Sequence, residues 1–286
     1  MAGTNPVFDR LNRQIDQERY AGFGSPRPGR SEGSTGVGVQ GTVTAEQLNE
    51  LYAQRSAGPI DTGRVTLDDV IIKSLTLFAV LVAAGLGSWV AVDNNRALLT
   101  PLWLGGAVVG LVLGLAIAFM RTVPTPLLFA YAAVEGAFVG AFSNYIDSVP
   151  RYSGVVVMAV LATVCTFGAM YAAYAMGLIK VTSRSRRMFI FMLGGYALFA
   201  LVQFVLVATG VVGGWGFGGS GPLGIGLSLL GTGLAAYSLA FDFDAIEHAV
   251  RAGAPRKYAW LLAHGLIVSV VWLYIEFVRL FARLRD

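Results

Sequence analysis

The hydrophobic residues of this chain gather in seven long runs that follow a polar, glycine-rich beginning. The runs occupy 70–92, 98–120, 126–142, 153–179, 188–212, 222–248 and 258–282. Each is close to the roughly 20 apolar residues that a helix needs to cross a bilayer. The pattern predicts an all-α integral membrane protein with seven transmembrane helices in residues 68–286.

Two of the runs are weaker candidates for a membrane span than the rest because each carries a carboxylate in its middle. These are Glu135 in the third run and Glu276 in the seventh. Six spans and a re-entrant segment are therefore the alternative. The start of the first helix is better marked. Thr66 is an N-cap residue, and the two aspartates after it lie at the positive end of the helix dipole.

Residues 1–67 have a different composition, with runs of Gly, Ser and Pro such as those at 22–29 and 31–36. Such segments bury too little apolar surface to offset the entropy that folding costs. They predict a mostly disordered tail.

Composition narrows the class of protein further. Hydrophobic residues make up 55% of the 286 residues and charged residues 13%, against about 25% charged in soluble domains. A soluble enzyme, a nucleic-acid binder and a secreted disulfide scaffold are excluded. One cysteine, Cys165, and two histidines leave no basis for a cysteine-rich or His-based metal site. We expect no cofactor.

Lysine and arginine indicate the orientation in the membrane. Seven arginines lie in the tail and eight basic residues in the loops on its side, whereas the opposite loops hold only Arg96 and Arg151. The positive-inside rule predicts a cytoplasmic N-terminus. Arg279, Arg283 and Arg285 would then lie at or near an outer C-terminus, against the trend.

Glycines at every fourth position predict close helix packing. They are Gly106, Gly110 and Gly114 in the second run, and Gly136 and Gly140 in the third. Small residues at this spacing allow helix backbones to approach each other.

Ionisable residues inside the runs are the candidates for function, because charge in hydrocarbon is costly and marks pathways, relays or partnered sites. They are Lys73, Glu135, Asp242, Asp244, His264, Glu276 and Arg279. Glu276 has apolar residues on both sides. For Asp244, a helix end at the inner surface is the preferred interpretation.

Three segments, 119–143, 237–246 and 272–281, together resemble the Bax inhibitor-1 family of transmembrane Bax-inhibitor-motif proteins, including its bacterial YccA-like members. The resemblance covers about residue 70 to the end. The tail, residues 66–69 and the pair Glu135-Gly136 resemble an actinobacterial-type branch, which implies the bacterial plasma membrane.

The resemblance implies six helices around a central seventh and a pH-sensitive calcium leak channel. It also implies a pH sensor and gate of Asp242, Glu276 and Arg121, in which the arginine latches one of two acids that share protons. The seventh-helix acid is glutamate here instead of aspartate. Gly110 stands where some bacterial members carry an acid, and Glu135 is expected to supply that carboxylate. Asp244 is a second residue of the possible ion path.

The physical chemistry of such a site agrees with this implication. Two carboxylates held close in low dielectric cannot both ionise cheaply, and their protons are released as a coupled pair. Oxygen ligands suit calcium, a hard cation. Asp242 and Glu276 fall short of a full calcium shell, so the expected binding is weak and transient.

Two other functions are alternatives. The chain could be a non-transporting interaction protein that modulates a membrane protease or another bilayer partner. It could also be a proton-coupled carrier, although no internal repeat supports this. No catalytic constellation is present in the sequence, so we expect no enzyme. The expected partners are the lipid bilayer and calcium or protons, with no nucleic acid.

The charge distribution generates a prediction about topology. Reporter fusions after Arg30, within 213–221 and at the C-terminus should read inside, outside and outside. A C-terminus on the inner side would contradict seven spans and favour six spans with a re-entrant segment.

Overall fold

The computed structural model describes residues 63–120, 123–211, 216 and 218–286, and these form seven long helices. They are α3 Leu67–Asn94, α4 Gly106–Phe119, α5 Thr125–Asp147, α6 Val155–Ala175, α7 Ser183–Ala208, α8 Pro222–Arg251 and α9 Tyr258–Arg285. Three short turns, Arg96–Leu98, Pro101–Gly105 and Pro150–Tyr152, precede α4 and α6. Together with the turns before α4 and α6, all seven are long and apolar enough to cross a membrane, which confirms the predicted number of spans.

Carboxylates do not interrupt the third and seventh spans. Helix α5 continues through Glu135 to Asp147, and α9 continues through Glu276 to Arg285. Helix α8 also remains helical beyond its apolar part. The re-entrant alternative is therefore not needed.

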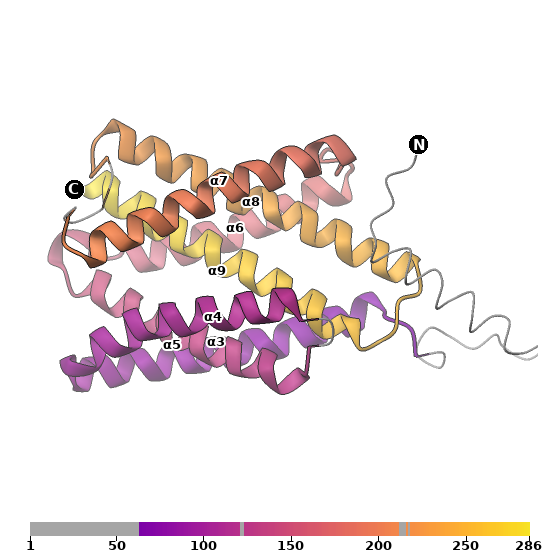
Figure 1. Cartoon of the computed structure of the whole chain (residues 1–286), viewed down its shortest axis with the longest axis horizontal. Helices are drawn as coiled ribbons and strands as arrows, with labels where there is room; N and C mark the ends of the chain where they lie inside the picture. Colours follow the sequence, from indigo (N-terminus) through magenta and orange to yellow (C-terminus); the bar gives the residue numbers. More distant parts are fainter. Residues whose placement is uncertain (1–62, 121–122, 212–215, 217) are drawn as a thin grey trace, which may run out of the picture. The chain divides into compact units, whose positions relative to one another are not determined.

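Helix α9 occupies the centre of the bundle (Figure 1). It has the largest buried share of the seven spans and packs against α3, α5, α6 and α8. Helices α4 and α7 lie at the periphery, where α4 packs on α5 and α7 on α8. Each still reaches α9 through a side chain, Ile117 from α4 and Tyr196 from α7. The arrangement of six helices around a seventh is confirmed.

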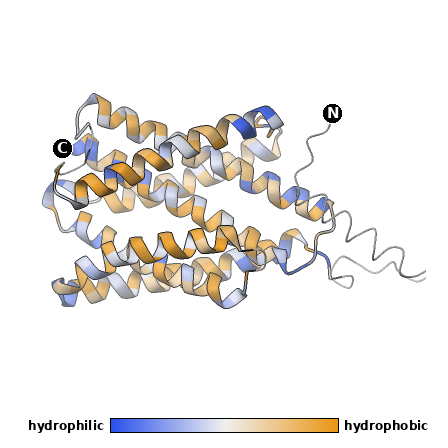
Figure 2. Cartoon of the chain, viewed as in Figure 1, coloured by the Kyte–Doolittle hydropathy of each residue, from blue (hydrophilic) through white to orange (hydrophobic). Residues whose placement is uncertain are grey.

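The helices run between two ends of the bundle. We call the end at which α3, α5, α7 and α9 begin the tail end, and the opposite end, at which α9 finishes, the far end. Apolar residues cover the length of the helices between the more polar ends (Figure 2). Many leucines, valines and phenylalanines are exposed on the outside of the bundle, as a surface in contact with lipid requires.

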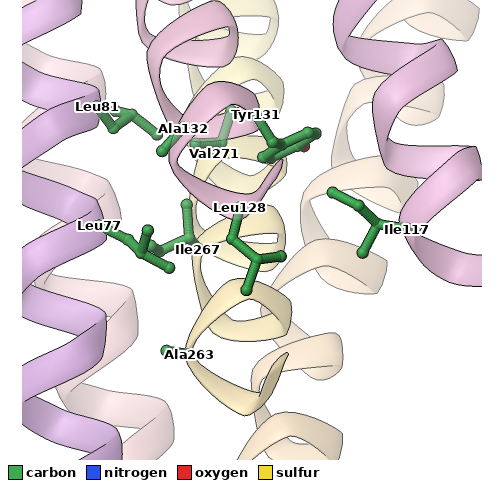
Figure 3. Close-up of a cluster of buried hydrophobic side chains, with 9 residues drawn as sticks. All are labelled: Leu77, Leu81, Ile117, Leu128, Tyr131, Ala132, Ala263, Ile267 and Val271. Atoms are coloured by element: carbon green, nitrogen blue, oxygen red, sulfur yellow. The ribbon is translucent and has the colours of Figure 1, made fainter. Parts of the chain in front are cut away.

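Side chains from four helices form the apolar core toward the tail end. Figure 3 shows them meeting around α9: Leu77, Leu81, Ile117, Leu128, Tyr131, Ala132, Ala263, Ile267 and Val271. Helices α3 and α5 approach each other especially closely. A Cβ at Gly140 would overlap the carbonyl oxygen of Gly85, so glycine permits the approach. The predicted packing role of Gly140 is confirmed.

The residues just before α3 are attached to the loop between α8 and α9. Val65 N–H donates to Ala254 O, and Arg256 N–H donates to Gly63 O, each at 2.8 Å. Val65 is also buried. The sequence predicts that the tail ends at residue 67. Because residues 63 and 65 already pair with the α8–α9 loop, the predicted end lies a few residues too far along the chain. The rest of the predicted tail lies outside the described residues.

Thr66 caps α3 as predicted, by accepting a hydrogen bond from Asp69 N–H at 3.1 Å. The Asp69 carboxylate in turn binds Arg256 at 2.8 Å. Asp69 is buried, whereas Asp68 beside it is exposed. One ion pair therefore links the first turn of α3 to the segment that leads into α9.

This link generates a prediction about stability. Asp69→Asn should lower the free energy of unfolding by about 2 kcal/mol, because Arg256 loses a charge-assisted hydrogen bond. Thermal melting in detergent would measure it. Asp68→Asn and deletion of residues 1–58, which leave the link intact, are the controls and should change the melting temperature little. A loss as large in either control would contradict the assignment.

Candidate functional site

Glu276 is the most deeply buried carboxylate of the described bundle, with 1% of the residue exposed. Three donors surround its Oε1: the Tyr196 hydroxyl at 2.6 Å, Trp272 Nε1 at 3.1 Å and Arg279 Nη1 at 3.3 Å. Its Oε2 is buried and has no hydrogen-bond partner among the described residues. Such an oxygen can still accept a proton donor or contribute to the binding of a cation.

The position of Glu276 depends on α8 as well as on α9. A side chain at Gly231 would collide with both the Tyr196 hydroxyl and Glu276 Oε2. Because residue 231 is glycine, α8 leaves room for Tyr196 of α7 to donate its hydrogen bond to Glu276 of α9.

A cavity of about 400 Å³ lies next to Glu276. Residues of α4, α5, α7, α8 and α9 line it, and most of them are apolar or aromatic. Arg279 and Arg283 join Glu276 as its charged residues. Arg283 donates to the carbonyl of Gly224 and to Ser228 Oγ, the latter at 3.0 Å. The cavity therefore combines an apolar wall with a charged side.

Asp242 lies elsewhere on α8, nearer the tail end. The Ser269 hydroxyl is the hydrogen-bonding side chain beside it. Its Oδ1 would lie 3.5 Å from a Cβ at Gly265, so Asp242 faces the first half of α9. Its Oδ2 is buried without a hydrogen-bond partner in the part of the chain that the structure describes.

The predicted pair of Asp242 and Glu276 is not formed. Glu276 faces Gly231 and Asp242 faces Gly265, and 11 residues separate these positions on both α8 and α9. At a rise of 1.5 Å per residue, the two carboxyl groups are about 16 Å apart along the helices. They cannot hold one calcium ion together in this state. The hydrogen-bonding side chain that α9 places beside Asp242 is Ser269 instead of an acid.

The reason lies in the turn between the two helices. Asp242 stands nine residues before Arg251, the last residue of α8, whereas Glu276 stands eighteen residues after Tyr258, the first of α9. In an antiparallel helix pair, residues at equal distances from the turn face each other. Unequal distances place these two acids at different depths.

Apolar residues fill the interface between the two acids. Ala235 and Leu239 from α8 and Leu273 from α9 are fully buried there. Water and ions are excluded from such a packed cluster. The bundle therefore has two carboxyl positions separated by an apolar barrier.

The remaining predicted residues have varied surroundings. Arg121 lies outside the described residues. Asp244 is buried and forms an ion pair with Arg186 of α7 at 2.8 Å. It lies seven residues before Arg251, the last residue of α8, so it is not at a helix end. Glu135 is hydrogen-bonded to Tyr131, and its Oε2 occupies the space beside Gly110. The expectation that Glu135 supplies a carboxylate at Gly110 agrees with this geometry.

Several residues of the site were not identified from the sequence. Trp272 could have been, because it stands four residues before Glu276 and so shares its helix face, as the predicted candidate Arg279 does three residues after it. Tyr196 and Ser269 carry no such signal, since their partners lie on other helices. Among the described residues, no three His, Cys, Asp or Glu side chains form a group that could hold a metal ion.

The surroundings of Glu276 generate a prediction. Tyr196→Phe should lower the free energy of unfolding by about 1–3 kcal/mol, because a buried carboxylate loses a donor. Tyr171→Phe is the matched control, since Tyr171 is exposed on α6. Melting in detergent compares the two variants. Equal shifts would show that the hydrogen bond between α7 and α9 contributes no stability.

Comparisons with known proteins agree with this architecture. Residues 5–286 match the family described as Bax inhibitor 1 like. The match begins in the tail, so it extends further than the resemblance carried by the three motifs. No curated protein matches the chain. Because nearly the whole chain is matched, this multi-pass membrane protein belongs to the Bax inhibitor 1 like family.

Proposed function

We propose that this protein is a pH-sensitive cation leak channel of the bacterial plasma membrane, with calcium as the favoured ion and its N-terminus in the cytoplasm. The observation that carries the proposal is the pair of separate carboxyl positions inside the bundle, each with one buried oxygen that lacks a hydrogen-bond partner among the described residues. Intramembrane acids of this kind mark ion and proton paths.

The proposed path has three parts. From the far end, the cavity leads to Glu276. The apolar cluster of Ala235, Leu239 and Leu273 then separates Glu276 from Asp242. Hydrophobic constrictions gate channels by excluding water. The arrangement is therefore that of a closed state, and conduction requires α8 and α9 to separate at the cluster.

Protons act on this path through its acids. A protonated carboxyl group is neutral and attracts cations weakly, whereas an ionised one attracts calcium and is costly to keep among apolar residues. Arg279 lies 3.3 Å from Glu276 and is its ion-pair partner. We assign gating to Asp242 and Glu276 as two separate sites. Arg121 remains the proposed latch, and Glu135 and Asp244 remain proposed contributors to the ion path.

Calcium flux into proteoliposomes, followed with an enclosed dye from pH 6 to pH 8, tests the proposal. Asp242→Asn and Glu276→Gln should each reduce the flux and flatten its dependence on pH. Because the two sites are about 16 Å apart and share no partner, their free-energy effects should add in the double variant within about 0.5 kcal/mol. A tightly coupled pair would instead make the second substitution nearly silent.

Asp68→Asn provides the control, since it removes one carboxylate at an exposed position of α3. It should leave the flux unchanged. Absence of flux through the wild-type protein at every pH would overturn the channel proposal. The favoured function would then be that of a non-transporting protein that modulates a membrane protease or another bilayer partner. No enzymatic reaction is assigned in either case.

A further inference from the structure

The cavity beside Glu276 is lined mainly by apolar and aromatic residues, in addition to its charged side. Aromatic side chains of α5, α7 and the turn before α4 form much of its wall, among them Trp103, Phe138, Phe142, Phe199 and Phe204. Its volume of about 400 Å³ lies within the range of roughly 300–1,000 Å³ of small-molecule sites. The charged residues Glu276, Arg279 and Arg283 occupy one side of the cavity, and the rest of its wall suits a hydrocarbon chain.

The cavity lies between the two peripheral helices. Its lining includes Ala107 of α4 and Ala200 of α7. Helix α4 packs on α5 and α7 packs on α8, so neither helix closes the cavity by packing along the other. In Figure 1 the two helices lie on opposite sides of α9. In the binding mode proposed for this cavity, a lipid chain enters between these two helices.

The length of the cavity matches one leaflet of a bilayer. On α7 its lining extends from Tyr196 to Val207, which are 11 residues apart. This is about 16 Å of helix. The hydrocarbon core of a bilayer is about 30 Å thick, so one leaflet contributes about half of that. The cavity thus accommodates one acyl chain lying along the helices.

Positive charge prevails on the α9 side of the cavity. Arg279 and Arg283 face it together with one acid, Glu276, so the three side chains carry a formal charge of +1. Arg283 stands two residues before Arg285, the last residue of α9, which places it near the depth of lipid headgroups. Arginine forks match phosphate geometry. The charge and its depth favour an anionic headgroup.

We propose that this cavity binds an anionic phospholipid from the leaflet at the far end. One acyl chain occupies the aromatic-lined space, and the phosphate lies at Arg279 and Arg283. The second acyl chain stays in the bilayer between α4 and α7. The lipid would then contact the guanidinium group that also binds Glu276, which connects lipid composition to the deepest carboxylate of the bundle.

Lipid retention tests the proposal without any ion gradient, so its outcome is independent of whether the protein conducts. The full chain would be purified in detergent with equal amounts of dioleoylphosphatidylglycerol and dioleoylphosphatidylcholine, and the lipids that stay bound would be counted by native mass spectrometry. The wild-type protein should retain about fivefold more phosphatidylglycerol. Equal retention of the two lipids would overturn the proposal.

Three variants separate the charge from the space. Arg279→Gln should remove the preference for phosphatidylglycerol. Ala200→Phe, and Ala107→Phe from the opposite wall, should reduce retention of both lipids by filling the cavity. Ala169→Phe, at an exposed position of α6, makes the same change outside the cavity and should have no effect. Cavity-filling variants that retain as much lipid as this control would overturn the proposal.

A third arm identifies the source of the anion. Sodium oleate, added at the same concentration, offers the same acyl chain with a carboxylate in place of the phosphate diester. Phosphatidylglycerol should remain bound in its presence. Replacement of phosphatidylglycerol by oleate would assign the cavity to free fatty acids and overturn the phospholipid proposal.

Discussion

The burial of Glu276 in the central helix is the constraint on which much of this structure depends. A charged group in an apolar interior requires donors, and α9 alone supplies only Trp272 and Arg279. The third donor, the Tyr196 hydroxyl, comes from α7, a peripheral helix with few other attachments. Gly231 of α8 is required because both groups fill the space of its missing side chain. One carboxylate thus fixes the relative positions of three helices.

Much of the fold could be predicted from the sequence because its signals are local. Long apolar runs identify all seven spans, and Thr66 caps α3 at the expected residue. The spacing of Gly136 and Gly140 indicates a close helix contact. The sequence alone does not show that the partner in this contact is α3. Val65 was assigned to the tail because the pairing that buries it involves the loop near Ala254, nearly 190 residues away.

The candidate site was predicted less well, because it depends on which residues face each other. Asp242 and Glu276 were both correctly identified as intramembrane acids, but resemblance placed them together. The α8–α9 turn, whose ends are marked by Arg251 and Tyr258, determines the register and places them about 16 Å apart. Counting residues from this turn would have separated them. No comparable count identifies Tyr196, since α7 and α9 are not joined by a turn.

The position of α7 connects the two carboxyl sites to the cavity. Its described polar links to the helices of the core lie at two levels: Arg186 binds Asp244 near the tail end, and Tyr196 binds Glu276 beside the cavity. Between them, Phe189 stacks on Phe241 of α8. No buried residue lies in its most apolar 18-residue stretch, so little apolar burial opposes its displacement. In the proposed channel, protonation of Glu276 would weaken the hydrogen bond that it accepts from Tyr196 of α7. In the proposed lipid site, a phosphate would compete with Glu276 for the guanidinium group of Arg279, which lies on α9 itself. The apolar cluster of Ala235, Leu239 and Leu273 joins α8 to α9 without a contribution from α7. The two proposals therefore place access to the acid and opening of the barrier at different helix contacts.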